Sequence, residues 1–143
     1  MIQIYPLHPV ADTARLFPVF FVRAGFPSPA QDYLELTIDL NKELIHNADA
    51  TFLGRVVGDS MVEENIDEGD VLIVDKSLSP APNDVVISSL NGEFTVKRFE
   101  LRNGKPVLVA GNPQYPPIYV NEWDDFTIWG VITYIIKRKR RVG

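Results

Sequence analysis

Ser60 is the residue best placed for nucleophilic chemistry. It follows Gly58-Asp59 after an apolar run, where a strand is expected to end and a short helix to begin. A serine at such a tight turn has an exposed hydroxyl and free backbone amides nearby, which can hold an oxyanion. The segment from Ser60 to Glu63 also matches a capping box, in which serine caps the helix and glutamate reaches back. On pattern alone the cap is the simpler interpretation, and both stay open.

A nucleophilic serine needs a base to take its proton. The chain has two histidines, His8 in the N-terminal segment and His46 at the end of the first expected helix. Neither has a motif around it, so we interpret both as surface or packing residues. The other possible base is a neutral lysine in an apolar place, because desolvation lowers the pKa of a lysine.

Lys97 is the best candidate for such a base. Alternation along the expected strand at 93–101 puts Lys97 on one face with Thr95, Phe99 and Leu101. Two large apolar neighbours favour a desolvated amine. The other face mixes apolar and charged residues, so a surface lysine whose stem alone is buried stays a second interpretation.

The composition excludes several other site chemistries. Cysteine is absent, which excludes disulfides, thiolate catalysis and cysteine-ligated zinc or iron–sulfur sites. Seven carboxylates gather between Asp59 and Asp75, but Gly69 falls where an EF-hand would need a ligand. We interpret this cluster as a solvated acidic surface, and we expect neither a metal nor a cofactor.

Charge is distributed unevenly along the chain, whose net value is −5. Residues 25–136 carry 18 acidic and 7 basic side chains, a net of −11, whereas the run Lys-Arg-Lys-Arg-Arg at 137–141 carries +5. An acidic body disfavours binding to a phosphate backbone, so little direct nucleic-acid binding is expected. The tail is interpreted as a solvated terminus, with a contact to DNA, RNA or a protein left open.

Strand signals and prolines predict a mainly β domain behind an extended arm. Five of the 11 prolines lie within residues 1–29, so residues 1–31 are expected to be extended with few regular hydrogen bonds. One short helix is expected at 39–46, capped by Asp39. Asn91-Gly92 predicts a two-residue hairpin turn. Strands are expected at 51–57, 71–74, 84–88, 93–101, 106–110, 118–120 and 126–136.

No apolar run is long enough to span a membrane and no basic signal start is present, so a cytoplasmic protein is expected.

Three motifs in this order resemble the serine–lysine peptidase domain of the LexA family. They are Gly58-Asp59-Ser60-Met61, the segment from Ile66 to Asp75, and the segment from Asp84 to Arg98, with Lys97 37 positions after Ser60. The arm that ends in Ala24-Gly25-Phe26-Pro27-Ser28-Pro29 resembles the UmuD branch of that family. The resemblance covers residues 21–136. It implies a fold of curved, mostly antiparallel sheets with an extended N-terminal arm and little helix.

The resemblance also implies roles for individual residues. Ser60 would be the nucleophile, Lys97 the general base, and the amides of Asp59 and Ser60 the oxyanion hole. The substrate would be the protein's own Ala24–Gly25 bond, cut when the protein meets a RecA filament on single-stranded DNA. Residues 1–24 would then be the arm that is removed, and residues 25–143 the peptidase domain with its tail. The product would form a homodimer and act as an accessory subunit of a translesion polymerase, as a partner of a UmuC-like subunit.

Besides the self-cleaving peptidase, two other functions remain open, and one is not expected. A sequence-specific repressor is not expected, because the 24 residues before Gly25 are too few for a helix-turn-helix domain. A pure binding module would leave Ser60 as a helix cap and Lys97 as a surface lysine. A third possibility is a processing peptidase that acts on other proteins.

Overall fold

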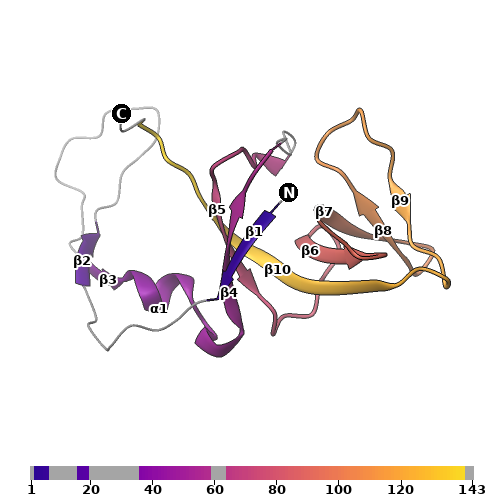
Figure 1. The fold of residues 1–143 in the computed structure, drawn as a ribbon. Helices are drawn as coiled ribbons and strands as arrows, with labels where there is room; N and C mark the ends of the chain where they lie inside the picture. Colours follow the sequence, from indigo (N-terminus) through magenta and orange to yellow (C-terminus); the bar gives the residue numbers. More distant parts are fainter. Residues whose placement is uncertain (1, 7–15, 20–35, 59–63, 141–143) are drawn as a thin grey trace. The chain divides into compact units, whose positions relative to one another are not determined.

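The computed structural model describes residues 2–6, 16–19, 36–58 and 64–140 (Figure 1). The chain divides into two units, Met1–Leu7 with Asn47–Gly143 in one and His8–His46 in the other. Among the described residues, no helix is long and apolar enough to cross a membrane.

An eight-stranded sheet forms the larger unit, in the order β1-β4-β5-β10-β6-β7-β8-β9. All its neighbouring strands are antiparallel, so the predicted mainly β fold class is confirmed. A single turn of 3-10 helix, η1 (Ala48–Ala50), precedes β4. The strands are β1 (Ile2–Pro6), β4 (Thr51–Val56), β5 (Val71–Asp75), β6 (Val85–Leu90), β7 (Glu93–Arg102), β8 (Lys105–Val109), β9 (Ile118–Tyr119) and β10 (Phe126–Ile136).

The smaller unit holds the two-stranded sheet of β2 (Leu16–Val19) and β3 (Leu36–Asp39), followed by helix α1 (Leu40–Leu44). The predicted cap is confirmed, because the Asp39 side chain accepts a hydrogen bond of 3.0 Å from the amide of Asn41. Such a bond satisfies one of the amides that a helix start leaves unpaired.

The N-terminal segment is extended where it is described, but the expectation of few regular hydrogen bonds was wrong there. β1 pairs with β4 over five residues, and β2 pairs with β3 over four. Pro6 and Pro18 do not prevent this pairing, because each of them lies in an edge strand. Pro6 ends the edge strand β1, and Pro18 lies in a sheet of two strands, both of which are edges.

Strand β10 (yellow in Figure 1) lies between β5 and β6. Its register shifts twice, between Ile128 and Gly130 and between Ile132 and Tyr134. Gly130 lies where β10 comes very close to β5, since a Cβ there would be 2.5 Å from Cγ1 of Val74. β10 pairs with both halves of the sheet, and register shifts of this kind bend a strand and increase its local twist.

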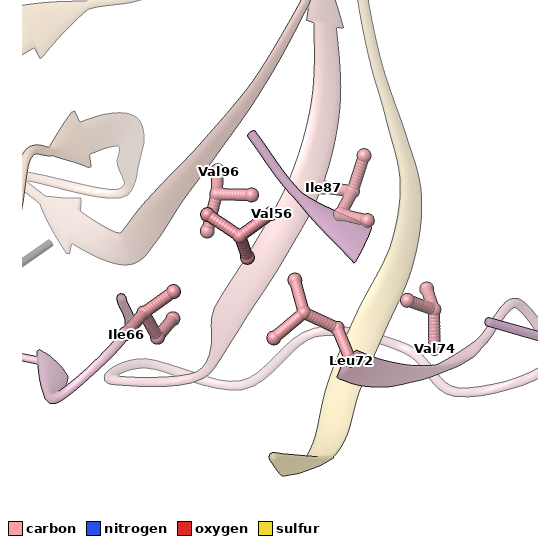
Figure 2. Close-up of a cluster of buried hydrophobic side chains, with 6 residues drawn as sticks. All are labelled: Val56, Ile66, Leu72, Val74, Ile87 and Val96. Carbon is pink, nitrogen blue, oxygen red and sulfur yellow. The ribbon is translucent and has the colours of Figure 1, made fainter. Parts of the chain in front are cut away.

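Two apolar clusters stabilise the sheet, one on each face. Val86 and Ile87 are successive residues of β6, point to opposite faces, and are both fully buried. Val86 belongs to a cluster with Phe99, Leu108 and Val131. Figure 2 shows the cluster on the other face, in which residues far apart in the sequence meet: Val56, Ile66, Leu72, Val74, Ile87 and Val96.

The β6–β7 hairpin sets the register that matters for the site. Asn91 and Gly92 both have positive φ, 51° and 87°, as a two-residue hairpin turn of the predicted kind requires. Asn91 is also held by the turn before β10, because its Nδ2 donates to Asp124 Oδ1 at 3.0 Å and its Oδ1 accepts from the amide of Asp125 at 2.9 Å. The ladder then runs unbroken from Leu90 opposite Glu93 to Val85 opposite Arg98.

Candidate active site around Lys97

Lys97 lies in the middle of β7, on the face of the sheet that carries the Val86 cluster. It is directly opposite Val86, which is fully buried, and two residues from Phe99, which is 6% exposed. Cross-strand partners share a face of the sheet, so apolar side chains surround the lysine stem on two sides. Leu101, also expected on this face, is exposed and adds nothing to this environment.

The ammonium group of Lys97 has two hydrogen-bond acceptors. Its Nζ donates to Thr95 Oγ1 at 2.6 Å and to the backbone oxygen of Val96 at 3.3 Å. None of the ion pairs within the described part of the chain involves Lys97. A neutral amine has two N–H groups and one lone pair. If both N–H groups donate to Thr95 Oγ1 and the Val96 oxygen, the lone pair points in a third direction and can accept a proton there.

Burial lowers the pKa of Lys97 from its ordinary value, because the charged form loses water and no carboxylate among the described residues pairs with it. A base of lowered pKa is neutral in a larger fraction of molecules near physiological pH. The predicted desolvated lysine is therefore present in the structure.

The opposite face of β7 holds the segment that follows Ser60. Arg98 Nη1 forms an ion pair of 2.8 Å with Glu64 Oε1, and Arg98 Nε lies 3.3 Å from Glu100 Oε1. Two core residues, Val56 and Ile66, flank the segment at 57–65 and pack in the same cluster as Val96 (Figure 2). The two ends of this segment are thus anchored on the face of β7 opposite to Lys97.

Several predicted site residues lie outside the described residues. These are Ser60, Asp59, Ala24 and Gly25, together with His8. The oxyanion hole and the cleavage site therefore stay predictions. His46 is described and is exposed, as expected of a surface residue.

Thr95 and Arg98 are the site residues whose roles the sequence analysis missed. The alternation did put Thr95 on the lysine face, and a hydroxyl two residues before a strand lysine was the signal available. Nothing local could have paired Arg98 with Glu64, which lies 34 residues earlier in the chain.

The acidic cluster and the basic tail meet at Lys137. Its Nζ donates to Asp67 Oδ2 at 2.9 Å and also to Asp70 Oδ2. Asp70 is buried and accepts from the amide of Asp67 at 2.8 Å as well. These carboxylates hold the start of the tail, and the next three basic residues, Arg138, Lys139 and Arg140, are exposed.

Comparisons with known proteins show which family the chain belongs to. A family model described as peptidase S24-like matches residues 18–133. The chain belongs to the peptidase S24 family. This confirms the family that the motifs around Ser60 and Lys97 indicated, and it places the chain in a family of serine peptidases.

Three relatives show how far the similarity extends. The chain is 45% identical to protein SamA of Salmonella typhimurium strain LT2 over 134 residues, which are 92% of this chain and 91% of SamA. It is 40% identical to protein ImpA of Escherichia coli over 141 residues, 96% of this chain and 94% of ImpA. With the LexA repressor of Clavibacter sepedonicus it shares 36% identity over 113 residues, 79% of this chain but 50% of the repressor.

Proposed function

We propose that this S24 peptidase cleaves itself once, at the Ala24–Gly25 bond. Ser60 is the nucleophile, Lys97 is the general base, and the amides of Asp59 and Ser60 form the oxyanion hole. One observation carries the proposal. Lys97 is desolvated beside Val86, has a lowered pKa, and has acceptors for two N–H groups.

Cleavage proceeds in two stages, formation of an ester at Ser60 and hydrolysis of this ester. Neutral Lys97 takes the proton of Ser60 Oγ as this oxygen attacks the carbonyl carbon of Ala24, and the tetrahedral oxyanion forms. Lys97 returns the proton to the nitrogen of Gly25, the C–N bond breaks, and an ester joins Ala24 to Ser60. Water then loses a proton to Lys97 and attacks the ester carbonyl carbon. The ester C–O bond breaks, Lys97 gives its proton to Ser60 Oγ, and the carboxyl group of Ala24 is released and ionises in water.

Val56 bounds how far Ser60 can lie from β7. Ser60 is four positions after Val56 in the chain, a reach of at most about 14 Å. Val56 packs in the cluster that contains Val96. Val96 and Lys97 are successive residues of β7 whose side chains point to opposite faces, so the proposal requires Ser60 to reach the Lys97 face from this anchor.

An intact-mass measurement tests the cleavage directly. Purified protein is incubated at pH 7 to 10, alone and with RecA, ATP and single-stranded DNA. We expect slow loss of the first 24 residues, faster at high pH and faster again with the filament. Ser60→Ala should abolish the cleavage and keep the fold, because loss of a helix cap costs only about 0.5–2 kcal/mol. Loss of the same residues from folded Ser60→Ala would contradict the mechanism.

The same experiment separates the competing functions. A pure binding module, with Ser60 as a helix cap, would keep its full mass under every condition. A processing peptidase would instead cut an added peptide with the sequence of residues 21–26, with repeated turnover.

We propose that the cleavage changes which surface is available to partners. The removed segment includes β1, whose pairing with β4 covers that edge of the sheet. An uncovered edge strand presents unpaired amides and carbonyls, to which another chain can bind. The product, residues 25–143, would form a homodimer and join a translesion polymerase as an accessory subunit, a role that rests on the UmuD resemblance.

A pull-down and a lesion-bypass assay test this role with two stable forms of the protein. One is a variant that starts at Gly25, and the other is uncleavable Ser60→Ala. We expect the shortened form to bind the polymerase subunit and support bypass, and the uncleavable form to do so poorly. Equal bypass by both forms would show that cleavage is not the switch.

A further inference from the structure

Ser88 has a buried hydroxyl for which the fold alone gives no reason. It lies in β6, is fully buried, and its Oγ has no hydrogen-bond partner among the described residues. A buried polar group left unpaired is destabilising, so such a group needs an explanation. Alanine would fill the same place without this penalty.

The register puts Ser88 beside the lysine site. Ser88 is directly opposite Thr95, and Val86, two residues earlier in β6, is directly opposite Lys97. All four side chains therefore share one face of the sheet. Cβ atoms of directly opposite residues are about 4.5–5.5 Å apart, so a rotation about χ1 can bring two short hydroxyls into hydrogen-bond range without backbone movement.

Thr95 has one proton to donate besides the bond that it accepts from Lys97. While Lys97 is charged, Thr95 Oγ1 can only accept from it. Once Lys97 is neutral, the Thr95 hydroxyl can instead turn and donate to the lone pair of Nζ. That lone pair is the one that must take the proton of Ser60.

We propose that Ser88 is a positioning residue, whose Oγ accepts the Thr95 proton when Lys97 is neutral and so keeps the amine lone pair free. The inference rests on the proposed role of Lys97 as the base. Ser88 touches neither the substrate nor the reacting atoms, and it acts through Thr95.

Other charged groups near this face are few in the part of the chain that the structure describes. Asp84 directly precedes β6, and its Oδ2 accepts from the amide of Ala81 at 2.8 Å. Asp75 is on β5, two strands beyond β6, and its Oδ1 accepts from the amide and the hydroxyl of Ser77. Arg98 is on the other face with Glu64 and Glu100. None of these forms an ion pair with Lys97. Among the described residues the Thr95 hydroxyl and the Val96 backbone oxygen bind its amine, and Ser88 can act on it through Thr95.

The first test follows the pH dependence of self-cleavage in Ser88→Ala. Without the acceptor, Thr95 donates to neutral Lys97, which makes the neutral amine more stable but less available. We expect the limiting rate at high pH to fall about 3- to 10-fold and the midpoint to move down by about 0.5–1 pH unit, as expected for one hydrogen bond. Ser89→Ala is the matched control, because Ser89 is the next residue on the opposite face.

Two further variants show whether the effect of Ser88→Ala comes from loss of the hydroxyl and acts through Thr95. Ser88→Thr keeps the hydroxyl and should restore the midpoint. In a Thr95→Val background, Ser88→Ala should have no further effect, because the group through which it acts is gone. A lower rate at every pH with an unmoved midpoint would show a merely structural role and overturn the inference.

The second test does not depend on cleavage. The titration of Lys97 is followed by NMR of its side chain in uncleavable Ser60→Ala, with and without Ser88→Ala. A midpoint lowered by Ser88→Ala and unchanged by Ser89→Ala supports the inference, and equal midpoints overturn it. Failure of the proposed function itself would look different, since wild-type protein would then not shorten at all.

Discussion

Lys97 and Lys137 are the same side chain in two opposite environments. Lys97 lies on an apolar face of β7 with a hydroxyl and a carbonyl as acceptors, and burial lowers its pKa. Lys137 bridges Asp67 and Asp70 after the end of β10, and hydrogen bonds to these carboxylates raise its pKa. The amine is easier to deprotonate where the sheet excludes water and no described carboxylate pairs with it. It becomes a structural cation where carboxylates are within reach.

The largest expected difference between the two lysines is in self-cleavage. Lys97→Ala should reduce the rate at least 1000-fold at every pH, because a base and its proton transfer are lost together. Lys137→Ala should leave the rate within about twofold, since an exposed ion pair contributes little. Intact-mass time courses measure both. Comparable losses in the two variants would mean that the environment of Lys97 is not what selects the base.

The second prediction concerns the pH profile. Below the pKa of Lys97, the neutral fraction grows tenfold per pH unit, so the logarithm of the rate should rise with a slope near one. The midpoint should fall below about 10.4, the value of an unperturbed lysine. Lys137→Ala should show the same profile as the wild type. A rate that stays constant between pH 7 and 10 would argue against a lysine base.

The third prediction concerns folding stability, which should change in opposite directions when Lys97 and Lys137 are replaced. Lys97→Met keeps the length of the stem and removes a poorly solvated charge, so the melting temperature at pH 7 should rise by a few degrees, equivalent to about 1 kcal/mol. Between the lowered folded pKa and the unfolded value, the unfolded chain binds more protons, so wild-type stability should rise with pH. Thermal melts from pH 7 to 10 should show this rise in the wild type and lack it in Lys97→Met.

The smallest expected effect belongs to Lys137. Lys137→Met should lower stability by about 0.5–1 kcal/mol, and less at high salt, because partly exposed ion pairs are weak and screened. A raised pKa means that this contribution is present below the unfolded value and is lost as pH rises through the folded value. Urea unfolding of the wild type and Lys137→Met at low and high salt measures the difference. A penalty that does not change with salt would indicate a packing role for the lysine stem instead.

Local sequence predicted most of the strands because their signals are short-range. The apolar run from Val71 to Val74 is the buried strand β5, and Asn91-Gly92 makes the turn that joins β6 to β7. The Asp39 cap was predicted in the same way. The prediction failed where prolines were taken to exclude ladders, since whether a strand lies at an edge depends on its neighbours and not on its own residues.

By itself, the sequence determined the type of the elements from Thr51 onward, the order of the three motifs and the family, and it indicated Lys97 rather than either histidine as the candidate base. Only the tertiary structure decided how Lys97 is surrounded, because this depends on the register that puts Val86 opposite Lys97 and Ser88 opposite Thr95. It also decided that Lys137 pairs with carboxylates about 70 residues earlier in the chain. The physical reason is that desolvation and ion pairing depend on distances across strands. A side chain's spacing along one strand gives its face, whereas its neighbours on that face come from other strands.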